Sequence, residues 1–323
     1  MIFRSFLSPL FLTLVVGATQ CFAQQSPAEC ADGKCIQVAS YNLELFGSDR
    51  SPYGGDDRGP RSDSSIDQIA KRIIADFDFE VIVFQEINTA SGEWIKLKQK
   101  LAASGYKFTE GQTSDRNQFV VLAWDADEIT LVDDSARELN VRTSFDLSDG
   151  CSDDGLRKPI AGRFQANNFD FWVIGVHLKS RVGAESCTQA IRTEQTCDLV
   201  NQIKLLETDS GESDFILVGD FNELHDHASF DPLTEAGFKC QMQFLAPDSG
   251  NGSYLKTGSL HQSEDLIDHV WLRYSRTQEL VRKSATVMKL TSADAAKRYI
   301  IEQSDHVPVW MSFRNDEDLD DND

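Results

Sequence analysis

The sequence predicts an α/β fold in which strands and helices alternate along one large domain. Short segments rich in Val, Ile and Phe alternate with segments whose apolar residues recur at helical spacing. Residues 170–178 are apolar on nearly both faces, which is typical of a central strand in a sheet that is covered on both sides. No Pro-rich linker divides the 323 residues into separate cores. These observations favour a single domain built around a covered sheet.

The first half of the chain predicts two strands, each followed by a helix. The first strand spans 36–42, and a loop rich in Gly, Ser, Asp, Arg and Pro follows over 48–64. Isoleucines at helical spacing after a serine cap predict a helix that begins near Ile66. A strand over 81–84 leads into a second helix, which ends at Gly105.

The second half of the chain predicts six further strands, one long helix and an acidic tail. The final residues, 314–323, contain six acids and almost nothing apolar, so we expect a solvated, disordered tail. The strands are expected at 119–124, 160–165, 170–178, 214–219, 267–272 and 307–313, and the helix at 188–207.

Residues 1–23 have the pattern of a secretory signal peptide. Arg4 precedes an apolar run, and small residues lead to Ala23, the expected cleavage point. The run is shorter than the ~20 residues that a membrane-spanning helix needs. Cys21 leaves a lipoprotein signal open, although the bulky Gln20 stands where such a signal has a small residue. We therefore expect a secreted or periplasmic protein without stable membrane association.

Six cysteines remain after the expected cleavage, and an even number in an exported chain predicts up to three disulfides. Cys30 and Cys35 enclose a turn-like stretch in the N-terminal segment 24–35, and we expect them to pair. Cys187 and Cys197 could close a loop, but within one helix they would lie ~15 Å apart and could not bond.

The chain is strongly acidic, with 31 Lys and Arg residues against 52 Asp and Glu residues and a formal net charge of −21. A negative surface disfavours non-specific adhesion to DNA or anionic membranes, so charge alone argues against a nucleic-acid-binding protein. Hydrophobic residues make up 41% of the chain, which is enough for a sizeable core and excludes disorder, collagen and coiled coil.

Many predicted strands end in a short polar cluster, where ligands and catalytic groups collect in α/β proteins. The clusters are rich in carboxylates and amides, include histidines and contain no thiolate. Such ligands favour a hard cation, Mg²⁺ rather than Zn²⁺, with Mn²⁺ and Ca²⁺ as alternatives. In chain order the clusters are Asn42-Leu43-Glu44, Gln85-Glu86, His177-Leu178, Gly219-Asp220-Phe221-Asn222, Ile267-Asp268-His269 and Ser304-Asp305-His306.

In this order, the clusters resemble those of the endonuclease/exonuclease/phosphatase superfamily, which has the deoxyribonuclease I-like fold. The resemblance runs from about Ile36 to Phe313 and implies one catalytic domain over 36–313. It also implies a four-layer α/β sandwich, in which two packed mixed β-sheets are flanked by helices. Residues 42–47 look most like the opening of deoxyribonuclease I itself, and Arg157-Lys158-Pro159 resembles the phosphate-contacting Arg-x-Pro segment of such nucleases.

The resemblance implies a role for each cluster in phosphodiester hydrolysis, a reaction that needs an activated water and a cation at the phosphoryl oxygens. Asp220 and Asn222 would orient the water and the phosphate. His306, oriented by Asp268, would act as general base or phosphate contact, and His177 would protonate the leaving oxygen or hold a non-bridging one. The implied metal ligands are Glu86, Glu44 and Asp305, and the implied phosphate-binding residues are Asn42 and Arg157.

One position departs from the pattern of deoxyribonuclease I-like nucleases, in which a glutamate supports the second histidine. This chain has Asn117 and Gln118 there. A neutral amide stabilises an imidazolium less well than a carboxylate does, so the departure weakens the acid role of His177. The metal and the pair of His306 with Asp268 would then carry more of the catalysis.

Other polar residues have simpler interpretations. His225 and His227 could be ligands by their spacing, but we expect them to line the loop after Asp220. His269 is expected to pack inside the protein. The arginines of the 48–64 loop are either ordinary loop residues or part of a loop that grips the substrate. These arginines are Arg50, Arg58 and Arg61.

The combined prediction is an exported, divalent-metal-dependent phosphodiesterase with DNA as its substrate, acting as an endonuclease. Some of the negative charge belongs to the site itself, where bound cations would partly neutralise it, so acidity does not exclude a nucleic-acid substrate. The alternatives are a sphingomyelinase-like phospholipid hydrolase, an inositol or small-molecule phosphatase, and a non-catalytic binding module. No protein partner is implied.

Overall fold

The computed structural model describes Cys30 and residues 34–48, 60–114, 116–145, 151–245, 252–255, 265–316 and 319. The expected signal peptide and most of the expected acidic tail lie outside these residues. Within the described part of the chain, no helix is long and apolar enough to cross a membrane.

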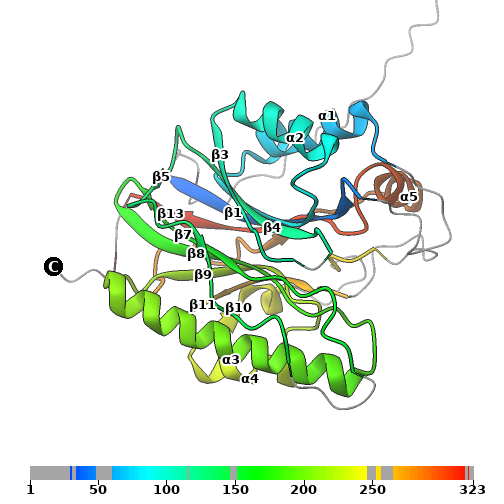
Figure 1. Ribbon diagram of the computed structural model, residues 1–323. Coiled ribbons are helices and arrows are strands. Elements are labelled where there is room, and N and C mark those ends of the chain that lie inside the picture. Colours follow the sequence, from blue (N-terminus) through cyan, green and yellow to red (C-terminus); the bar gives the residue numbers. More distant parts are fainter. Residues whose placement is uncertain are drawn as a thin grey trace, which may run out of the picture.

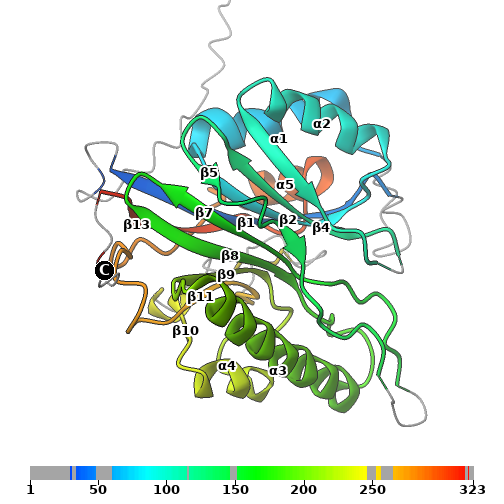
Figure 2. The same cartoon turned by 60° about the vertical axis from the view of Figure 1, so that its left-hand side comes forward.

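Two mixed β-sheets stack face to face, and helices cover the outer face of each (Figures 1 and 2). The first sheet has the strand order β12 (Thr286–Val287), β13 (Val309–Arg314), β1 (Cys35–Phe46), β2 (Val81–Ile87), β4 (Phe119–Asp125) and β3 (Tyr106–Glu110). The second has the order β10 (Lys239–Cys240), β11 (Asp268–Leu272), β9 (Phe215–Asp220), β8 (Phe169–His177), β7 (Ile160–Ala166) and β5 (Thr130–Leu131), and β6 (Arg137–Glu138) pairs with β7.

The helices form the two outer layers. On the first sheet lie α1 (Asp63–Lys71) and α2 (Gly92–Ala102), with α5 (Ala293–Glu302) beside them; on the second lie α3 (Glu185–Ser210) and α4 (Asp231–Glu235) (Figure 2). A π-helical segment over Arg72–Phe77 continues α1, and 3₁₀ turns span Ala228–Phe230 and Gln241–Phe244. The predicted four-layer α/β sandwich is therefore confirmed.

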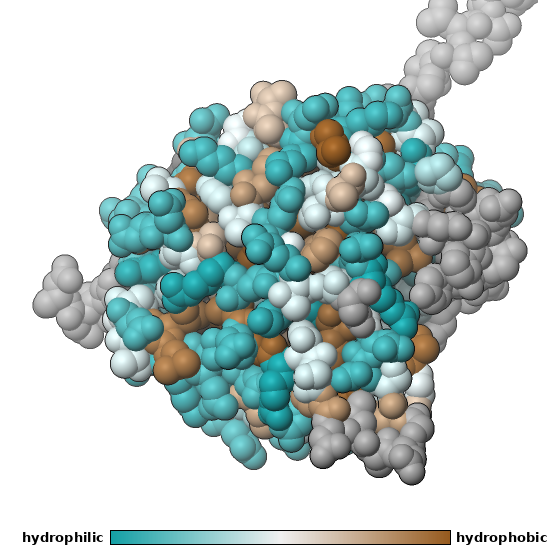
Figure 3. All heavy atoms as spheres, viewed as in Figure 1, coloured by the Kyte–Doolittle hydropathy of each residue, from teal (hydrophilic) through white to brown (hydrophobic). Residues whose placement is uncertain are grey.

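The two sheets pack across an apolar core. A Cβ atom on Gly175 of β8 would lie 2.5 Å from Cγ1 of Val83 on β2, so glycine allows the sheets to approach closely here. The rings of Trp124 on β4 and Phe164 on β7 also meet between the sheets, with centroids 5.6 Å apart. On the face seen in Figure 3, apolar residues are scattered in small groups among hydrophilic ones.

All eight predicted strands and all three predicted helices are present, with shifted ends. The two-sided apolar strand, β8, lies inside its sheet between β7 and β9, as predicted. The first strand extends to Phe46 because β1 continues past an irregularity in its pairing with β2 between Asn42 and Phe46. Likewise, β13 ends at Arg314 and the amide of Asn315 donates to Lys34 O at 3.0 Å, so the sheet includes the first residues of the expected tail.

The sequence did not predict β3, the two-residue strands β5, β6, β10 and β12, or the helices α4 and α5. Two residues are too few to show a period, so these edge strands depend on pairing with a neighbour. Helix α5 did have a local signal, because Ser292 caps it by accepting from the amide of Ala295 at 3.1 Å. Its buried residues, Ala296, Tyr299 and Ile300, also follow helical spacing.

Two disulfides join described cysteines. Cys30 pairs with Cys35, as expected, with their Cα atoms 5.3 Å apart. Cys151 pairs with Cys187 at the start of α3, with a Cα–Cα distance of 5.6 Å. Cys197 lies further along the same helix and is not bonded to Cys187; together with Cys240 it remains a free thiol. A third disulfide is therefore not formed among the described residues.

Glu80, just before β2, provides a test of stability against pH. Its carboxylate accepts from the amide of Gln37 at 2.5 Å, and burial raises its pKa to about 8. A raised folded-state pKa means that the folded protein favours the neutral form of Glu80. The contribution of this preference to stability is complete below about pH 4.3, the unfolded value, and is lost as the pH rises through 8. Glu80→Gln, which stays neutral, should remove that loss, which is about 1.4 kcal/mol for each unit that separates the folded-state and unfolded-state pKa values.

Urea unfolding of the wild type and Glu80→Gln between pH 5 and 8.5 measures this effect. The control is Asp76→Asn, which changes an exposed acid of the same region and should keep the wild-type pH dependence. Equal slopes of unfolding free energy against pH for the wild type and Glu80→Gln would contradict the prediction.

Candidate active site

The polar clusters at the strand ends meet where the two sheets pack together. The Nδ2 of Asn42, on β1 of the first sheet, donates to Asp220 Oδ2 on β9 of the second sheet at 3.0 Å. The same amide lies 3.4 Å from Oε1 of Glu86 on β2. Clusters 178 residues apart in sequence thus come into direct hydrogen-bond contact.

Left-handed backbone conformations turn these clusters toward one another. Glu44, Leu45, Glu86 and Asn222 have φ angles of 43°, 49°, 62° and 57°, and each such non-glycine residue costs roughly 1–3 kcal/mol. Hydrogen bonds compensate for part of this cost. The amide of Leu45 donates to Glu86 Oε2 at 2.8 Å, and the amide of Glu44 donates to Asn42 Oδ1 at 2.9 Å.

His306 and Asp268 form a buried pair. His306 Nδ1 and Asp268 Oδ2 are 2.7 Å apart, and the amide of Asp268 is held by Ser253 Oγ at 3.0 Å. Burial lowers the pKa of His306, but the carboxylates of Asp268, Asp220 and Asp305 outweigh it and raise the pKa well above its usual value. Because Asp268 occupies Nδ1, the Nε2 atom faces Asp220 Oδ2 at 3.9 Å and Asp305 Oδ1 at 4.0 Å.

His177, at the end of β8, has a different environment. Its Nε2 lies 3.6 Å from Asp220 Oδ2 and 3.9 Å from Glu86 Oε1. Its Nδ1 is buried and has no hydrogen-bond partner among the described residues. Burial, followed by the charges of Arg157 and His306, lowers the pKa of His177 well below its usual value. A neutral imidazole can donate to a phosphoryl oxygen but is a poor proton source.

The departure at Asn117 and Gln118 has a structural consequence. Gln118 Oε1 accepts from Arg157 Nη2 at 2.6 Å, and His177 Nδ1 has no hydrogen-bond partner among the described residues. Gln118 therefore supports the phosphate-binding candidate instead of the histidine. This agrees with the weaker acid role that the sequence predicts for His177.

Asp220 and Asn222 are fixed by their neighbours. The amide of Asn222 donates to Asp220 Oδ1 at 2.8 Å, and Asn222 Nδ2 donates to Leu178 O at 3.1 Å. Burial and the nearby Asp268 raise the pKa of Asp220 to about 7, although His306 opposes this shift. A bound cation would stabilise the charged form of Asp220, which burial and Asp268 disfavour.

The donor chemistry of the site fits a divalent cation. The buried Oδ1 of Asp268 has no hydrogen-bond partner among the described residues. Asp220, Asp268 and His306 each offer one ligand atom, and these atoms lie within 4.8 Å of one another. This grouping differs from the predicted ligands, which are Glu86, Glu44 and Asp305.

The predicted ligands nevertheless share the site with Asp220, as Tyr254 shows. Burial, followed by the charges of Asp305, Glu44, Asp220 and Glu86, raises the pKa of Tyr254 to about 12, so all four acids act on the same tyrosine. The Tyr254 ring also lies against His306, with centroids 5.1 Å apart. Sequence reasoning missed Tyr254 because it stands in an irregular segment without a recognisable pattern.

The other three histidines that the structure describes lie outside this constellation. His269 is buried, its Nε2 lies 2.9 Å from Leu266 O, and burial lowers its pKa to about 4, in agreement with the expected packing role. His227 Nδ1 lies 3.0 Å from Ser229 Oγ and caps a helical turn, and His225 lies against His269 with ring centroids 6.5 Å apart. Arg61 is buried, so it does not grip the substrate, whereas Arg50 and Arg58 lie outside the described residues.

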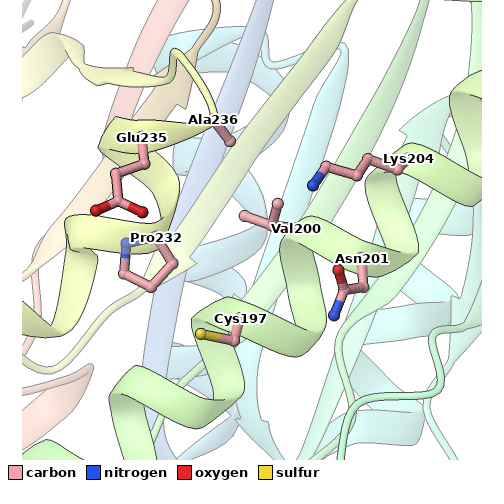
Figure 4. A pocket seen from close by; sticks show the side chains of 7 residues that line it. All are labelled: Cys197, Val200, Asn201, Lys204, Pro232, Glu235 and Ala236. Atoms are coloured by element: carbon pink, nitrogen blue, oxygen red, sulfur yellow. The ribbon is translucent and has the colours of Figure 1, made fainter.

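A separate hollow opens between α3 and α4, away from these clusters (Figure 4). Its lining includes the free Cys197, together with Lys204 and Glu235. Burial, followed by the charges of Glu194 and Asp198, raises the pKa of the Cys197 thiol, which makes it a weak nucleophile. None of the lining residues belongs to the site at the strand ends.

Three solved structures that share the fold are the human Nocturnin catalytic domain, a mannosyl-6-phosphatase from Bacteroides thetaiotaomicron and D. rerio TDP2 complexed with single-strand DNA product. Nocturnin is 16% identical, with 87% of this chain and 93% of that chain covered and a TM-score of 0.57. The phosphatase is 20% identical, with 85% and 98% covered and a TM-score of 0.56. TDP2 is 13% identical, with 87% and 99% covered and a TM-score of 0.58. At these identities the likeness shows the fold alone.

A family-wide pattern gives stronger information than these single structures. No curated protein matches the sequence at a significant level. The pattern of the Endonuclease/Exonuclease/phosphatase family matches residues 39–306, a span that begins in β1 and ends at His306, and so includes every predicted site residue. The chain belongs to the endonuclease/exonuclease/phosphatase family.

Proposed function

We propose that this protein is an exported, divalent-metal-dependent phosphodiesterase that cleaves DNA as an endonuclease. Membership of the family supports hydrolysis of phosphoesters. The observation that carries the proposal is the pair of His306 and Asp268 beside Asp220, whose Oδ2 lies 3.9 Å from His306 Nε2. The resemblance of residues 42–47 to the opening of deoxyribonuclease I, and of the Arg157 segment to a nuclease phosphate contact, favours DNA among the substrates of the family.

In this proposal the protein side chains hold the phosphate and move the protons. Asn42, Arg157 and the neutral His177 would donate hydrogen bonds to phosphoryl oxygens. Asp268 holds Nδ1 of His306 and favours its charged form, so the Nε2–H would contact a phosphoryl oxygen. Asp220 would orient the attacking water and accept its proton as the new bond to phosphorus forms; the bond from phosphorus to the leaving oxygen would break, and that oxygen would take a proton from solvent.

A bound Mg²⁺, with Mn²⁺ or Ca²⁺ as alternatives, would supply positive charge at the phosphoryl oxygens. The residues that would hold it are Glu86, Asp220 and Asp305, with Glu44 near them. Carboxylate oxygens of this kind suit a hard divalent cation.

Export is part of the proposal. The signal-like pattern of residues 1–23 supports it, and so do the two disulfides, because disulfides persist in oxidising compartments.

A small phosphomonoester is the second candidate substrate, because several cations near the site are already engaged. Lys179 Nζ donates to Asp154 O at 2.9 Å, and Arg181 lies 2.7 Å from Glu223 and 3.5 Å from Asp265. These two cations are therefore less available to hold a long polyanion, which would suit a small substrate such as a sugar or inositol phosphate. A phospholipid headgroup is also compatible with this site.

Nicking of supercoiled plasmid in the presence of Mg²⁺ tests the proposed function. The expected result is conversion to open circles that stops on addition of a chelator and resumes when Mg²⁺ or Mn²⁺ is restored. Asp220→Asn, purified in parallel, controls for contaminating nuclease and should be inactive. Absence of chelator-sensitive nicking across divalent metals and pH would reject the DNA proposal. A panel of sphingomyelin, inositol phosphates and sugar phosphates would then identify the alternative.

A further inference from the structure

Arg61 lies just before α1, and its side chain is completely buried, with 0% exposed. Its guanidinium donates to the main-chain carbonyls of two separate segments. Nη2 donates to Leu43 O and, at 2.8 Å, to Glu44 O. Nε donates to Gln303 O at 2.7 Å. One side chain thus joins the end of β1 to the segment that follows α5.

Both segments carry candidate active-site groups. The end of β1 presents Asn42 and Glu44, and its Leu45 amide holds the carboxylate of Glu86 at 2.8 Å. The segment after Gln303 presents Asp305 and His306. Because these groups come from different parts of the chain, their mutual geometry depends on how the two segments are held together.

The end of β1 needs this support because its backbone leaves the regular ladder. Glu44 and Leu45 have left-handed φ angles of 43° and 49°, and the pairing of β1 with β2 is irregular between Asn42 and Phe46. A buried carbonyl without a donor costs about 1–3 kcal/mol. The planar guanidinium, with five N–H donors, can serve carbonyls on both segments at once, whereas a lysine ammonium cannot reproduce that geometry.

The guanidinium is itself held in place, so it is not available to a substrate. Its Nη1 lies 3.7 Å from Glu93 Oε2, and the Arg61 amide donates to Glu93 Oε1 at 2.6 Å. Glu93 Oε2 also accepts from the amide of Gly47 at 2.9 Å. On another side, the guanidinium lies 4.8 Å from the centroid of the Phe46 ring. Glu93 balances its charge and the aromatic ring limits its movement.

We propose that Arg61 is a positioning residue, which holds Asn42 and Glu44 in register with Asp305 and His306 for binding of the metal and the phosphate. The inference rests on the proposed function, because it concerns the same site. Ser304 provides a second, weaker link: its Oγ donates to Asn42 O at 2.7 Å and accepts from the amide of His306 at 3.0 Å.

The test compares Arg61→Met and Arg61→Lys with the wild type by three measurements on the full chain. Amide hydrogen exchange in metal-free protein should rise in residues 42–47 and 303–306 for Arg61→Met. The Kd for Mn²⁺, measured by calorimetry, should rise about 10–100-fold, the usual effect of losing a residue that orients metal ligands. Hydrolysis should show a fall in kcat that exceeds any rise in KM, and Arg61→Lys should fall between the other two proteins.

The matched control is Arg163→Met, which removes a partly buried ion pair with Asp170 at the opposite end of the second sheet. It should lower the unfolding temperature without changing exchange in 42–47 or 303–306, or the Kd for Mn²⁺. If Arg61→Met does not fold, Arg61→Lys decides the matter alone. If a folded Arg61 variant shows unchanged amide hydrogen exchange in residues 42–47 or in residues 303–306, the inference is overturned. A wild-type protein that neither binds Mn²⁺ nor hydrolyses a phosphoester would reject the proposed function, while the exchange data would still decide the role of Arg61.

Discussion

Asp268→Asn should lower kcat for phosphodiester hydrolysis by about 10³–10⁴, with little change in KM. In a serine protease triad, the same exchange behind a histidine costs about 10⁴ because the amide favours the wrong imidazole tautomer. The physical situation here is similar, since Asp268 Oδ2 lies 2.7 Å from His306 Nδ1 and both residues are buried. An asparagine in this position could neither hold the Nδ1 proton in the same way nor stabilise a charged ring.

Steady-state hydrolysis of a chromogenic phosphodiester, alongside plasmid nicking, measures this effect. Asp226→Asn changes an exposed acid in the loop after β9 and should remain within a factor of two of the wild type. If the pair acts as a unit, the double variant Asp268→Asn/His306→Asn should be no slower than His306→Asn alone. Additive losses, or a folded Asp268→Asn protein with nearly wild-type kcat, would show that the pair does not work as proposed.

Asp220→Asn should reduce kcat/KM by at least about 10³, equivalent to about 4 kcal/mol of transition-state stabilisation. Its Oδ2 accepts from Asn42 Nδ2 at 3.0 Å and lies 3.6 Å from His177 Nε2 and 3.9 Å from His306 Nε2. An amide at this point cannot accept a proton from water. It would also weaken any bound cation and would place an NH₂ group, or a weaker acceptor, against Asn42.

Steady-state kinetics and a Mn²⁺ titration of Asp220→Asn distinguish the loss of the proton acceptor from the loss of cation binding. Asp214→Asn is a suitable control, since Asp214 is equally buried but lies just before β9, at the opposite end of the strand from Asp220. It should destabilise the fold without reducing the kcat/KM of the folded fraction. Equal activity in the wild-type and Asp220→Asn preparations would show that the activity does not come from this site, as the interpretation of the chain as a non-catalytic binding module predicts.

The elements that local patterns predicted correctly share one property: each has enough residues to show a period. The strands over 119–124 and 214–219, for instance, were identified from apolar runs and appear as β4 and β9. The edge strands of two residues were missed because their pairing partners, not their own composition, make them strands. Helix α5 was not predicted, although Ser292 caps it and is a local signal of its start.

In the candidate site, too, the sequence predicted what local motifs encode and did not predict contacts between distant residues. The order and chemical types of the clusters predicted which residues would come together. The structure places Asn42, His177 and His306 around Asp220 Oδ2, at 3.0, 3.6 and 3.9 Å, and Glu86 3.4 Å from Asn42 Nδ2. The partner of Gln118 could not be predicted, because its contact with Arg157 spans 39 residues and depends on the path of two loops. Similarly, the pairing of Cys151 with Cys187 spans 36 residues, and six cysteines leave many connectivities open.

The sequence by itself determined the alternation of strands and helices, the oxygen-rich chemistry of the site and the family, because periodicity and motif order are encoded in neighbouring residues. Only the tertiary structure decided which oxygens and nitrogens meet. Asn42 reaches Asp220 because two separate sheets pack face to face, and Arg61 is buried beneath the end of β1 because that strand turns out of its ladder. Those contacts depend on sheet packing and left-handed backbone turns, which are properties of the whole fold and not of any local segment.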